Sequence, residues 1–544
     1  MLAKLRSRLD ILAGAAFAAL SVYYVIRSFL LTFSTDIWYD ELFSMEFVKR
    51  PVSELISLTA RDVHPPLYYL ILKAFEDFGK AAGFVGDGAE LLPVESAAKM
   101  VSLLPFVIMI IYAMTTVRKH FGMLTAGLFS LAIVVMPQLP EYTTEIRMYS
   151  WAMLFVTATL LHSFGLYRHF IKGAPGWDIP DGAAIFVYTA AAAYTHYYAA
   201  FCVGIILGLL FIRMLCAYVS RMKGNGDKVS FKAVATLIIC MNLSAVSYIP
   251  WASVVLSQVK AVKSNYWIQP VGIRSLGSCV KYIYMGYFFN DVLIYGLSVA
   301  MFLITAALVI RAFLRVLREK DMDAGFSVYA FLILLLEVAV GLAVSALIRP
   351  VFVNRYMLPA FGCLWLSVCI MLGKEIALLR KRGFKKQLVP GILTFAMILM
   401  MLVTGIQDYK VFRGNEEYRK VQLANMYEYF DTIDPDTIVI SNFDQAQALL
   451  SYYLNRGEKE MDVYLYGASP EALMSEMLPT LKTIEDPVDI HNYLVSGKDV
   501  LFLGSFNSRE DILLDWNEMY GITSKNEGSY LMERYWFDAF RLQE

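Results

Sequence analysis

Charged residues are scarce in this sequence of 544 residues. Asp, Glu, Lys and Arg make up 18% of the chain and hydrophobic residues 58%, whereas soluble globular chains have about 25% charged residues. The 48 basic residues balance the 48 acidic ones, so the formal net charge is zero. No global field therefore attracts nucleic acid or an acidic protein, and we expect no nucleic-acid partner.

Cysteine is scarce too, and its positions argue against two kinds of site. The six cysteines all lie in or beside hydrophobic stretches, and no CxxC pair occurs among them. This spacing disfavours a structural zinc site and a disulfide framework. The residues after 406 contain no cysteine, so a domain formed there must depend on its own hydrophobic core. The cysteines are Cys202, Cys216, Cys240, Cys279, Cys363 and Cys369.

The hydrophobic residues gather in long blocks, and the mean hydropathy of the chain is +0.52. A helix that crosses a bilayer needs about 20 mainly apolar residues. The first block, 12–31, is too long for a signal peptide and lacks a small-residue cleavage site, so we interpret it as a retained span. We predict an α-helical polytopic membrane protein with about 11 transmembrane helices. They lie near 11–31, 100–117, 122–138, 149–167, 183–197, 199–217, 233–254, 291–312, 327–348, 356–373 and 388–406.

The distribution of Lys and Arg predicts the orientation. Cytoplasmic loops carry an excess of these residues, and alternate loops here are basic when the N-terminus is cytoplasmic. An odd number of spans then places residues after 407 outside the cell membrane. The THYY step at 195–198 interrupts the fifth and sixth spans, and losing either would reverse that placement; the basic loops argue against this. The basic residues are Lys4, Arg6, Arg8, Arg118, Lys119, Arg168, Lys172, Arg221, Lys223, Lys228, Lys232, Arg311, Arg315, Arg318, Lys320, Arg380, Lys381, Arg382, Lys385 and Lys386.

Two outer segments are large. Residues 52–63 and 67–84 have helical spacing with one polar face, which predicts helices in the membrane interface. Residues 407–544 alternate helical stretches with short apolar runs, which is typical of a small α/β domain. Its predicted helices are 416–433, 444–454 and 509–520, its strands 437–441, 462–467 and 499–505, and its turns 434–435 and 526–528. We therefore predict a transmembrane domain, 1–406, whose outer loop 32–98 carries the active site, and an extracytoplasmic α/β domain, 407–544, that helps to bind the acceptor.

Ionisable residues cluster just outside the first span. The sequence TDIWYDELF at 35–43 holds Asp36, Asp40 and Glu41, and RDVHPPLYYL at 61–70 holds Asp62 and His64. A charge at membrane depth costs about 2.5–3.5 kcal/mol on insertion scales, so such groups tend to mark functional sites. Carboxylates in the wet headgroup layer cost little, which is the plainer alternative. The two prolines after His64 favour a site, because they fix the backbone at a helix start.

These motifs resemble the C-type glycosyltransferase superfamily, in particular bacterial relatives of protein O-mannosyltransferases and of lipid A aminoarabinose transferases. The resemblance rests on the YDE step after the first span, HPPLYY, EIRMYS at 145–150, YTHYYAAF at 194–201 and NRYMLPA at 354–360. The steps occur in the family's order and cover about residues 1–410. The resemblance implies a polyprenyl-phosphate-linked sugar donor, action at the outer face, and an essential acidic residue at Asp40, with Glu41 beside it.

Elementary chemistry is consistent with this assignment. Moving a sugar from a phosphate to a hydroxyl needs a base on the acceptor and positive charge or hydrogen-bond donors on the phosphate. Asp40 is the candidate base, and arginine suits a phosphate because its planar fork donates two hydrogen bonds. The acceptor is a glycolipid, a cell-wall glycan or a protein. The predicted donor-binding residues are Asp62, His64, Arg147, Tyr149, His196, Tyr197, Arg355 and Tyr356.

Each of these residues has a structural alternative. Arg147 and Arg355 could anchor helix ends, Glu145 could pair with Arg147, His196 could be a buried histidine, and Tyr197 could belong to an interfacial aromatic belt. A divalent metal stays possible, because sequence cannot show that ligands converge. The main rival function is a transporter or flippase. Transporters usually place charged residues near the middle of spans. Here the span centres are nearly free of charge, with Glu337 as the exception, and the polar residues gather at the outer ends, which favours an interfacial enzyme. A third alternative is a non-catalytic membrane sensor or scaffold with an outer binding domain.

Overall fold

The structure, a computed structural model, describes residues 2–86, 91–224, 229–261, 268–287, 290–383, 387–456, 459–532 and 534–544, with side chains from residue 8. Lys4, Arg6, Lys228, Lys385 and Lys386, used above to predict orientation, lie outside the described side chains. The chain forms two compact units. We call the first the helical unit: Met1–Leu30, Thr59–Ile71 and Lys99–Phe412. The second, the α/β unit, contains Leu31–Leu58, Leu72–Ala98 and Arg413–Glu544.

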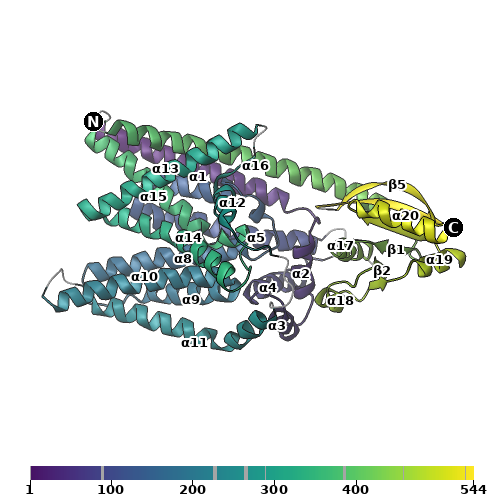
Figure 1. Ribbon diagram of the computed structural model, residues 1–544. Helices are drawn as coiled ribbons and strands as arrows, with labels where there is room; N and C mark the ends of the chain where they lie inside the picture. The colour runs from purple at the N-terminus through teal and green to yellow at the C-terminus, as the bar shows by residue number, and fades with distance from the viewer. Residues whose placement is uncertain are drawn as a thin grey trace. The chain divides into compact units, whose positions relative to one another are not determined.

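Long apolar helices run alongside one another in the helical unit (Figure 1). In the described residues, 9 helical segments are long and apolar enough to cross a membrane. They include α1 Leu2–Leu31, α5 Val94–Tyr112 with its continuation to Phe121, α8 Tyr149–Ile171, α10 Tyr197–Met222, α11 Phe231–Ala261, α13 Asp291–Glu319, α14 Met322–Leu347, α15 Phe361–Arg382 and α16 Leu388–Phe430. The polytopic helical fold is thus confirmed.

Two predicted spans form shorter helices. The stretch near 122–138 becomes α7 Met123–Val135, of 13 residues, and the stretch near 183–197 becomes α9 Ile179–Thr195, of 17 residues. The number of 11 spans therefore stays a prediction. The remaining elements of this unit are a π-helical turn η1 Ala113–Val117, α6 Arg118–Phe121, the 3-10 helices η2 Glu141–Thr143 and η3 Asn354–Ala360, and α12 Ile273–Tyr284.

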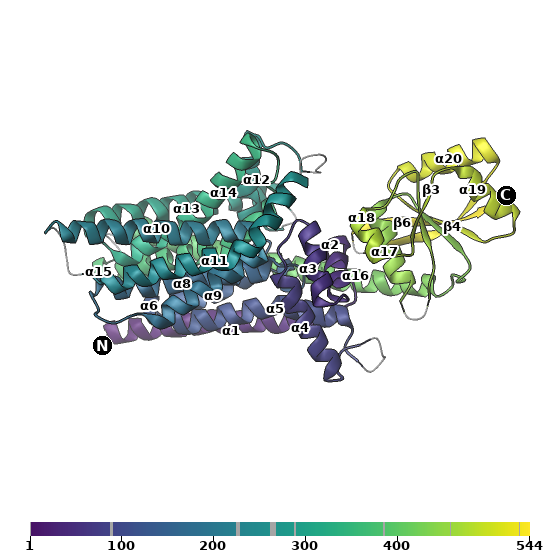
Figure 2. The same ribbon diagram turned by 90° about the horizontal axis from the view of Figure 1, so that it is seen from below.

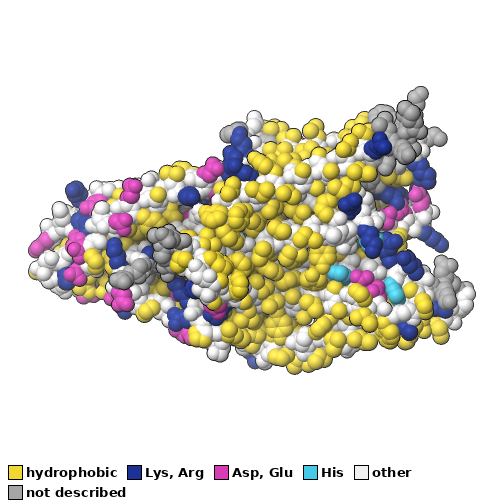
Figure 3. Space-filling view, turned by 180° about the vertical axis from the view of Figure 1, so that it is seen from behind, with side chains coloured by type: hydrophobic (Ala, Val, Ile, Leu, Met, Phe, Trp, Pro, Cys, Tyr) yellow, Lys and Arg dark blue, Asp and Glu magenta, His cyan; other side chains and the backbone are white. Residues whose placement is uncertain are grey.

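Basic residues mark one end of the helical unit. The helices α8, α10 and α15 end in Arg168, Arg221 and Arg380, respectively, within their last turns. Their 23, 26 and 22 residues make them about 33–39 Å long at about 1.5 Å per residue, enough to cross a hydrocarbon core of about 30 Å. Figure 3 shows a broad hydrophobic surface over the helices, with Lys and Arg gathered at its right-hand end.

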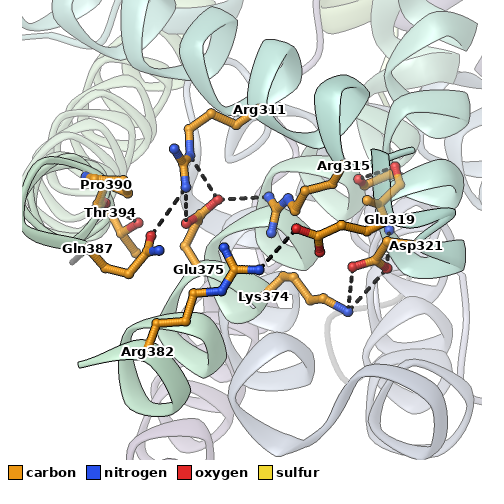
Figure 4. Close-up of polar contacts among 12 residues, drawn as sticks. Arg311, Arg315, Glu319, Asp321, Lys374, Glu375, Arg382, Gln387, Pro390 and Thr394 are labelled. Carbon is orange, nitrogen blue, oxygen red and sulfur yellow. Dashed lines mark hydrogen bonds and ion pairs between the residues drawn. The ribbon is translucent and has the colours of Figure 1, made fainter. Parts of the chain in front are cut away.

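Ion pairs tie the helices together near that basic end (Figure 4). Arg311 on α13 donates from Nε and Nη2 to the two carboxylate oxygens of Glu375 on α15, both at 3.1 Å. Arg315 donates to the same carboxylate at 2.7 Å. The Glu375 side chain is 1% exposed and that of Arg315 8%, so this charge cluster is buried. Lys374 forms a second set of pairs, with Asp321 and Asp323 at the start of α14.

The α/β unit contains one six-stranded sheet in the order β3-β2-β1-β4-β6-β5. The first four strands in that order are parallel, and the last two pair antiparallel. Helices α19 and α20 cover one face and α17 the other (Figure 2). Trp516 of α20 and Phe502 of β4 pack in the core of the first face. The elements are β1 Ile438–Ser441, α17 Asp444–Leu454, β2 Val463–Tyr466, α18 Ala472–Met477, β3 Leu481–Ile484, α19 Pro487–Val495, β4 Val500–Ser505, α20 Ser508–Tyr520, β5 Thr523–Met532 and β6 Tyr535–Gln543.

Much of the first outer loop belongs to this α/β unit. The loop forms α2 Tyr39–Val48, α3 Val52–Arg61 and α4 Leu67–Ala81, and the last two match the predicted amphipathic helices. The end of α3 and the start of α4, with the residues between them, belong to the helical unit. The loop is therefore divided between both units, whereas we had assigned it to the transmembrane domain.

Three strands were not predicted, and one predicted turn is wrong. The strands β3 and β5 carry many polar residues, so they lack the apolar runs that identified β1, β2 and β4. In β6 the apolar residues are interrupted by Asp538 and Arg541. Residues 526–528 do not form a turn. They lie inside β5, where the pairing register with β6 shifts between Asn526 and Gly528. Gly528 adopts a φ of +140°, a conformation that glycine tolerates and that suits a β-bulge.

Glu375→Gln should destabilise the protein by about 3 kcal/mol, because it leaves the buried charge of Arg315, and the 35% exposed charge of Arg311, without a counter-charge. The measurement is thermal unfolding of the purified protein in detergent. Glu319→Gln is the matched control, since its pair with Arg382 is 42% and 43% exposed and should contribute less than about 1 kcal/mol. Equal melting temperatures for the two variants would contradict the importance of the buried cluster.

Candidate functional site

A single histidine separates two long helices. His196 lies between α9 and α10 with extended backbone angles, φ −157° and ψ 136°. Its Nδ1 accepts a hydrogen bond from the backbone N of Tyr198 at 3.2 Å, so the ring caps the N-terminus of α10. Because Nδ1 accepts, a neutral ring carries its proton on Nε2. The break between the two helices at the THYY step thus leaves the Nε2–H of buried His196 as a hydrogen-bond donor.

Aromatic side chains surround His196. Its ring centroid lies 5.3 Å from that of Tyr356, 5.4 Å from that of Tyr149 and 5.9 Å from that of His64. His196 is 2% exposed. Four of the predicted site residues, from four separate stretches of sequence, therefore meet in one buried cluster. Tyr198 also belongs to it, with its ring 4.9 Å from that of Tyr356.

Two arginines lie at this cluster. The guanidinium carbon of Arg355 lies 6.0 Å from the centroid of the Tyr149 ring. Arg147 is 4% exposed, two residues before α8, so it does not simply extend into solvent from a helix end. The charges of both arginines help to lower the pKa of His64. The arginines of EIRMYS and NRYMLPA therefore act electrostatically on the histidine of HPPLYY.

His64 and Asp62 form a hydrogen-bonded pair. His64 Nδ1 lies 3.2 Å from Asp62 Oδ2. Burial is the largest cause of a lowered pKa for His64, and the charges of Arg147 and Arg355 lower it further, against the opposing effect of Asp62. Burial opposes ionisation of Asp62, but the hydrogen bond and charge of His64, the backbone N–H of Val63 and the charge of Arg147 together lower its pKa. The pair is thus an ionised carboxylate beside a neutral imidazole whose Nδ1–H donates.

Tyr197 has a different position from the other predicted residues. Its hydroxyl donates to Oε1 of Gln258 on α11 and accepts from Nε1 of Trp251 at 3.2 Å. Gln258 Nε2 in turn donates to backbone carbonyls of Thr59, at 3.1 Å, and of Asp62, at 2.5 Å. This network holds the end of α3 and the start of the HisProPro segment. Gln258 was missed in the sequence, where the only signal is one amide in a long apolar helix.

The site lies where three helices begin. Tyr149 opens α8, His196 precedes α10, and Arg355 lies in the short η3 helix that leads into α15. The N-terminus of a helix carries a partial positive charge and unpaired N–H groups, so it favours an anion. The helix N-termini and the two arginines therefore all contribute positive charge at this site. The arrangement is suited to a phosphate group.

A cavity of 340 Å³ lies beside Arg355 in sequence and space. Its lining combines the apolar Ile268, Phe352 and Val353 with the hydroxyls of Ser275 and Ser278 and the amide of Asn354. Asn354 donates from Nδ2 to Ser278 Oγ at 2.6 Å. Small-molecule sites in proteins have volumes of about 300–1,000 Å³ and a similar mixture of apolar and polar groups.

Asp40 and Glu41 belong to the α/β unit. Both lie in the first turn of α2, where Asp40 is half-buried and Glu41 is buried. Glu41 Oε2 accepts a hydrogen bond from the backbone N of Trp38 at 3.0 Å, so Glu41 stabilises the start of this helix. Within the described part of the chain, no group of three His, Cys, Asp or Glu side chains is arranged to hold a metal ion.

The stability of the helical unit should decrease on acidification. His64 has a folded pKa below its unfolded value of 6.5, so the unfolded state binds more protons and stability is lost as the pH falls below about 6.5. Melting temperatures in detergent between pH 5 and 7.5 test this expectation. His64→Asn should flatten the dependence, and His169→Asn, at the far end of α8, should not. A His64→Asn slope equal to that of the wild type would refute the assignment.

Solved structures share the fold of nearly the whole chain. ArnT from Cupriavidus metallidurans in the apo state matches with a TM-score of 0.51 at 14% identity, covering 97% of this chain and 98% of that one. The same protein bound to undecaprenyl phosphate matches with a TM-score of 0.53 at 12% identity and the same coverage. The apo oligosaccharyltransferase of Archaeoglobus fulgidus has a TM-score of 0.41 at 10% identity, covering 93% and 69%.

These likenesses concern the fold alone. No protein-family model matches the sequence, and no curated protein matches it. ArnT is a C-type glycosyltransferase, so the family resemblance predicted from the YDE, HPP and NRYMLPA motifs is confirmed at the level of architecture. The chain has the fold of a C-type glycosyltransferase.

Proposed function

We propose that the protein is a membrane glycosyltransferase that transfers a sugar from a polyprenyl-phosphate-linked donor to a glycolipid, cell-wall glycan or protein acceptor. The observation that carries the proposal is the cluster of buried Arg147, half-buried Arg355 and the Nε2–H of buried His196 at three helix N-termini. An anionic substrate group is what such a cluster would bind. The solved ArnT structure that shares this fold holds undecaprenyl phosphate, which is such a group on a prenyl lipid.

In the proposed reaction, the bond between the anomeric carbon and the phosphate oxygen breaks, and the anomeric carbon bonds to the acceptor oxygen. Asp40 removes the proton of the acceptor hydroxyl. Arg147, Arg355 and His196 stabilise the negative charge that develops on the departing polyprenyl phosphate. Asp62 orients the imidazole of His64, which lies beside that of His196. The hydroxyls and the amide that line the 340 Å³ cavity are proposed to bind the sugar.

We also propose an orientation with a cytoplasmic N-terminus and the reaction at the outer face. The three helices that begin at the site end in basic turns about a bilayer thickness away. Cytoplasmic ends of spans carry the excess of Lys and Arg, so the site end would be extracytoplasmic. By the same argument, the Asp40 segment that follows α1 would also lie outside.

Asp40→Asn should lower the turnover number for sugar transfer by about 10²–10⁴-fold, the usual contribution of a positioned general base. The assay follows sugar release from a synthetic polyprenyl-phosphate donor by the purified protein. Asp77→Asn, an exposed carboxylate of the same unit paired with Lys73, is the control and should keep full activity. Equal turnover by the Asp40 variant and the wild type would remove Asp40 from catalysis. A transporter would show no sugar release with either protein.

Arg355→Lys should raise the KM for the donor by about tenfold, which corresponds to about 1.4 kcal/mol for loss of a bidentate arginine–phosphate contact. The lysine keeps the positive charge, so the change tests geometry and not charge alone. Arg274→Lys is the control, because Arg274 is exposed on α12 of the same unit. An unchanged donor KM for Arg355→Lys would argue against a phosphate contact by this residue.

A further inference from the structure

We propose that residues 413–544 of the α/β unit, called the C-terminal domain below, position the carboxylate of Asp40. Tyr453 is the principal positioning residue. The inference rests on the proposed role of Asp40 as the base. It assigns the C-terminal domain a part in catalysis, whereas the sequence suggested acceptor binding. Side chains of this domain hold Ile37 and Trp38, and Tyr39, the third residue before Asp40, is buried.

Tyr453 holds the backbone of Ile37. Tyr453 lies on α17 and is 2% exposed. Its hydroxyl accepts a hydrogen bond from Ile37 N at 2.8 Å, and the carbonyl oxygen of Ile37 lies 3.1 Å from the same hydroxyl. The carbonyl oxygen of Thr35 is 3.4 Å away. The phenol of Tyr453 thus forms hydrogen bonds with both backbone polar groups of Ile37, a buried residue outside any helix or strand. Buried backbone N–H and C=O groups need such partners, because water cannot reach them.

Trp38 contacts another part of the domain, and Tyr39 is buried near charges of two of its helices. The guanidinium carbon of Arg534, beside the hairpin between β5 and β6, lies 4.1 Å from the centroid of a Trp38 ring. At this distance a cation–π attraction fixes the ring. Tyr39 is buried, and its pKa is raised by burial and by the nearby charges of Glu471 and Asp444. These charges come from the starts of α18 and α17.

The holding elements are also joined to each other. Tyr535 at the start of β6 donates a hydrogen bond to Oε1 of Gln445 on α17, and its ring lies 5.5 Å from that of Phe443. The hairpin of β5 and β6 is therefore attached to α17, and both contact the segment before Asp40. On the other side of Asp40, Glu41 binds the backbone N of Trp38 and closes the first turn of α2. The backbone of Asp40 is consequently fixed from both directions.

Such support matters because transfer depends on placement. A misplacement of about 1 Å can cost about 10²-fold in rate, even when the altered residue lies away from the reacting atoms. Removing the Tyr453 hydroxyl removes its hydrogen bonds to Ile37. It does not change the proposed phosphate-binding residues Arg147, His196 and Arg355, because none of them belongs to the α/β unit. The expected signature is a lower turnover number with little change in donor affinity.

The test compares Tyr453→Phe with Tyr429→Phe in the full-length protein. Tyr429 also donates from a phenol in this domain, to Glu527 at 2.8 Å, but it does not hold residues 35–39. Tyr453→Phe should lower kcat about tenfold with a donor KM within about twofold of the wild type. Tyr429→Phe should keep the wild-type kcat. Size-exclusion profiles and melting temperatures of both variants separate loss of fold from loss of placement.

Double variants distinguish the route of the effect. If Tyr453 acts through Asp40, Tyr453→Phe should lower the residual transfer of Asp40→Asn no further, because the carboxylate is already absent. A further tenfold loss in the double variant would overturn the inference. So would a wild-type kcat for Tyr453→Phe alongside an inactive Asp40→Asn, which would leave the proposed function standing. Full activity of Asp40→Asn would instead defeat the proposed function itself.

Discussion

The high cost of placing charge in hydrocarbon organises the helical unit. Because a bilayer tolerates few ions, most charged groups of the described spans lie near the ends of the helices, and Glu337, buried within α14, is an exception. At the basic end, Glu375 forms ion pairs with both Arg311 and Arg315 and joins α13 to α15. At the other end, Arg147 and Arg355 lie among histidine and tyrosine rings where three helices begin. The first arrangement is closed by its own ion pairs, and the second is suited to an anion.

The sequence predicted the features that depend on local pattern. Apolar blocks located the long helices, the polar faces of 52–61 and 67–81 located α3 and α4, and apolar runs located β1, β2 and β4. The motifs around His64, Arg147, His196 and Arg355 were correctly grouped, although they lie far apart in the chain. Residues of these types at helix starts are informative, because a buried charge or histidine there needs a partner.

Features that depend on tertiary contacts could not be predicted. Gln258 is one amide in an apolar helix, and its bonds to Thr59 and Asp62 arise only when α11 packs beside that segment. Tyr453 lies in a YYL step that resembles many others, and nothing in its neighbours indicates that its hydroxyl binds residue 37. The strands β5 and β6 pair with each other, β6 also pairs with β4, and pairing leaves little trace in single-sequence composition.

The interleaved chain of the α/β unit has a consequence for biosynthesis. This unit combines residues 31–58 and 72–98 with residues 413–544, and β6, the last strand to be made, lies between β4 and β5. At about 5–20 residues per second, a ribosome produces the Asp40 segment tens of seconds before its supports on α17 and the final hairpin. During that interval the segment lacks the phenol that satisfies its backbone. A nascent chain at this stage would hold the acidic residue without the scaffold that orients it, so the Asp40 segment would become ordered only after α17 and the strands β5 and β6 have been made.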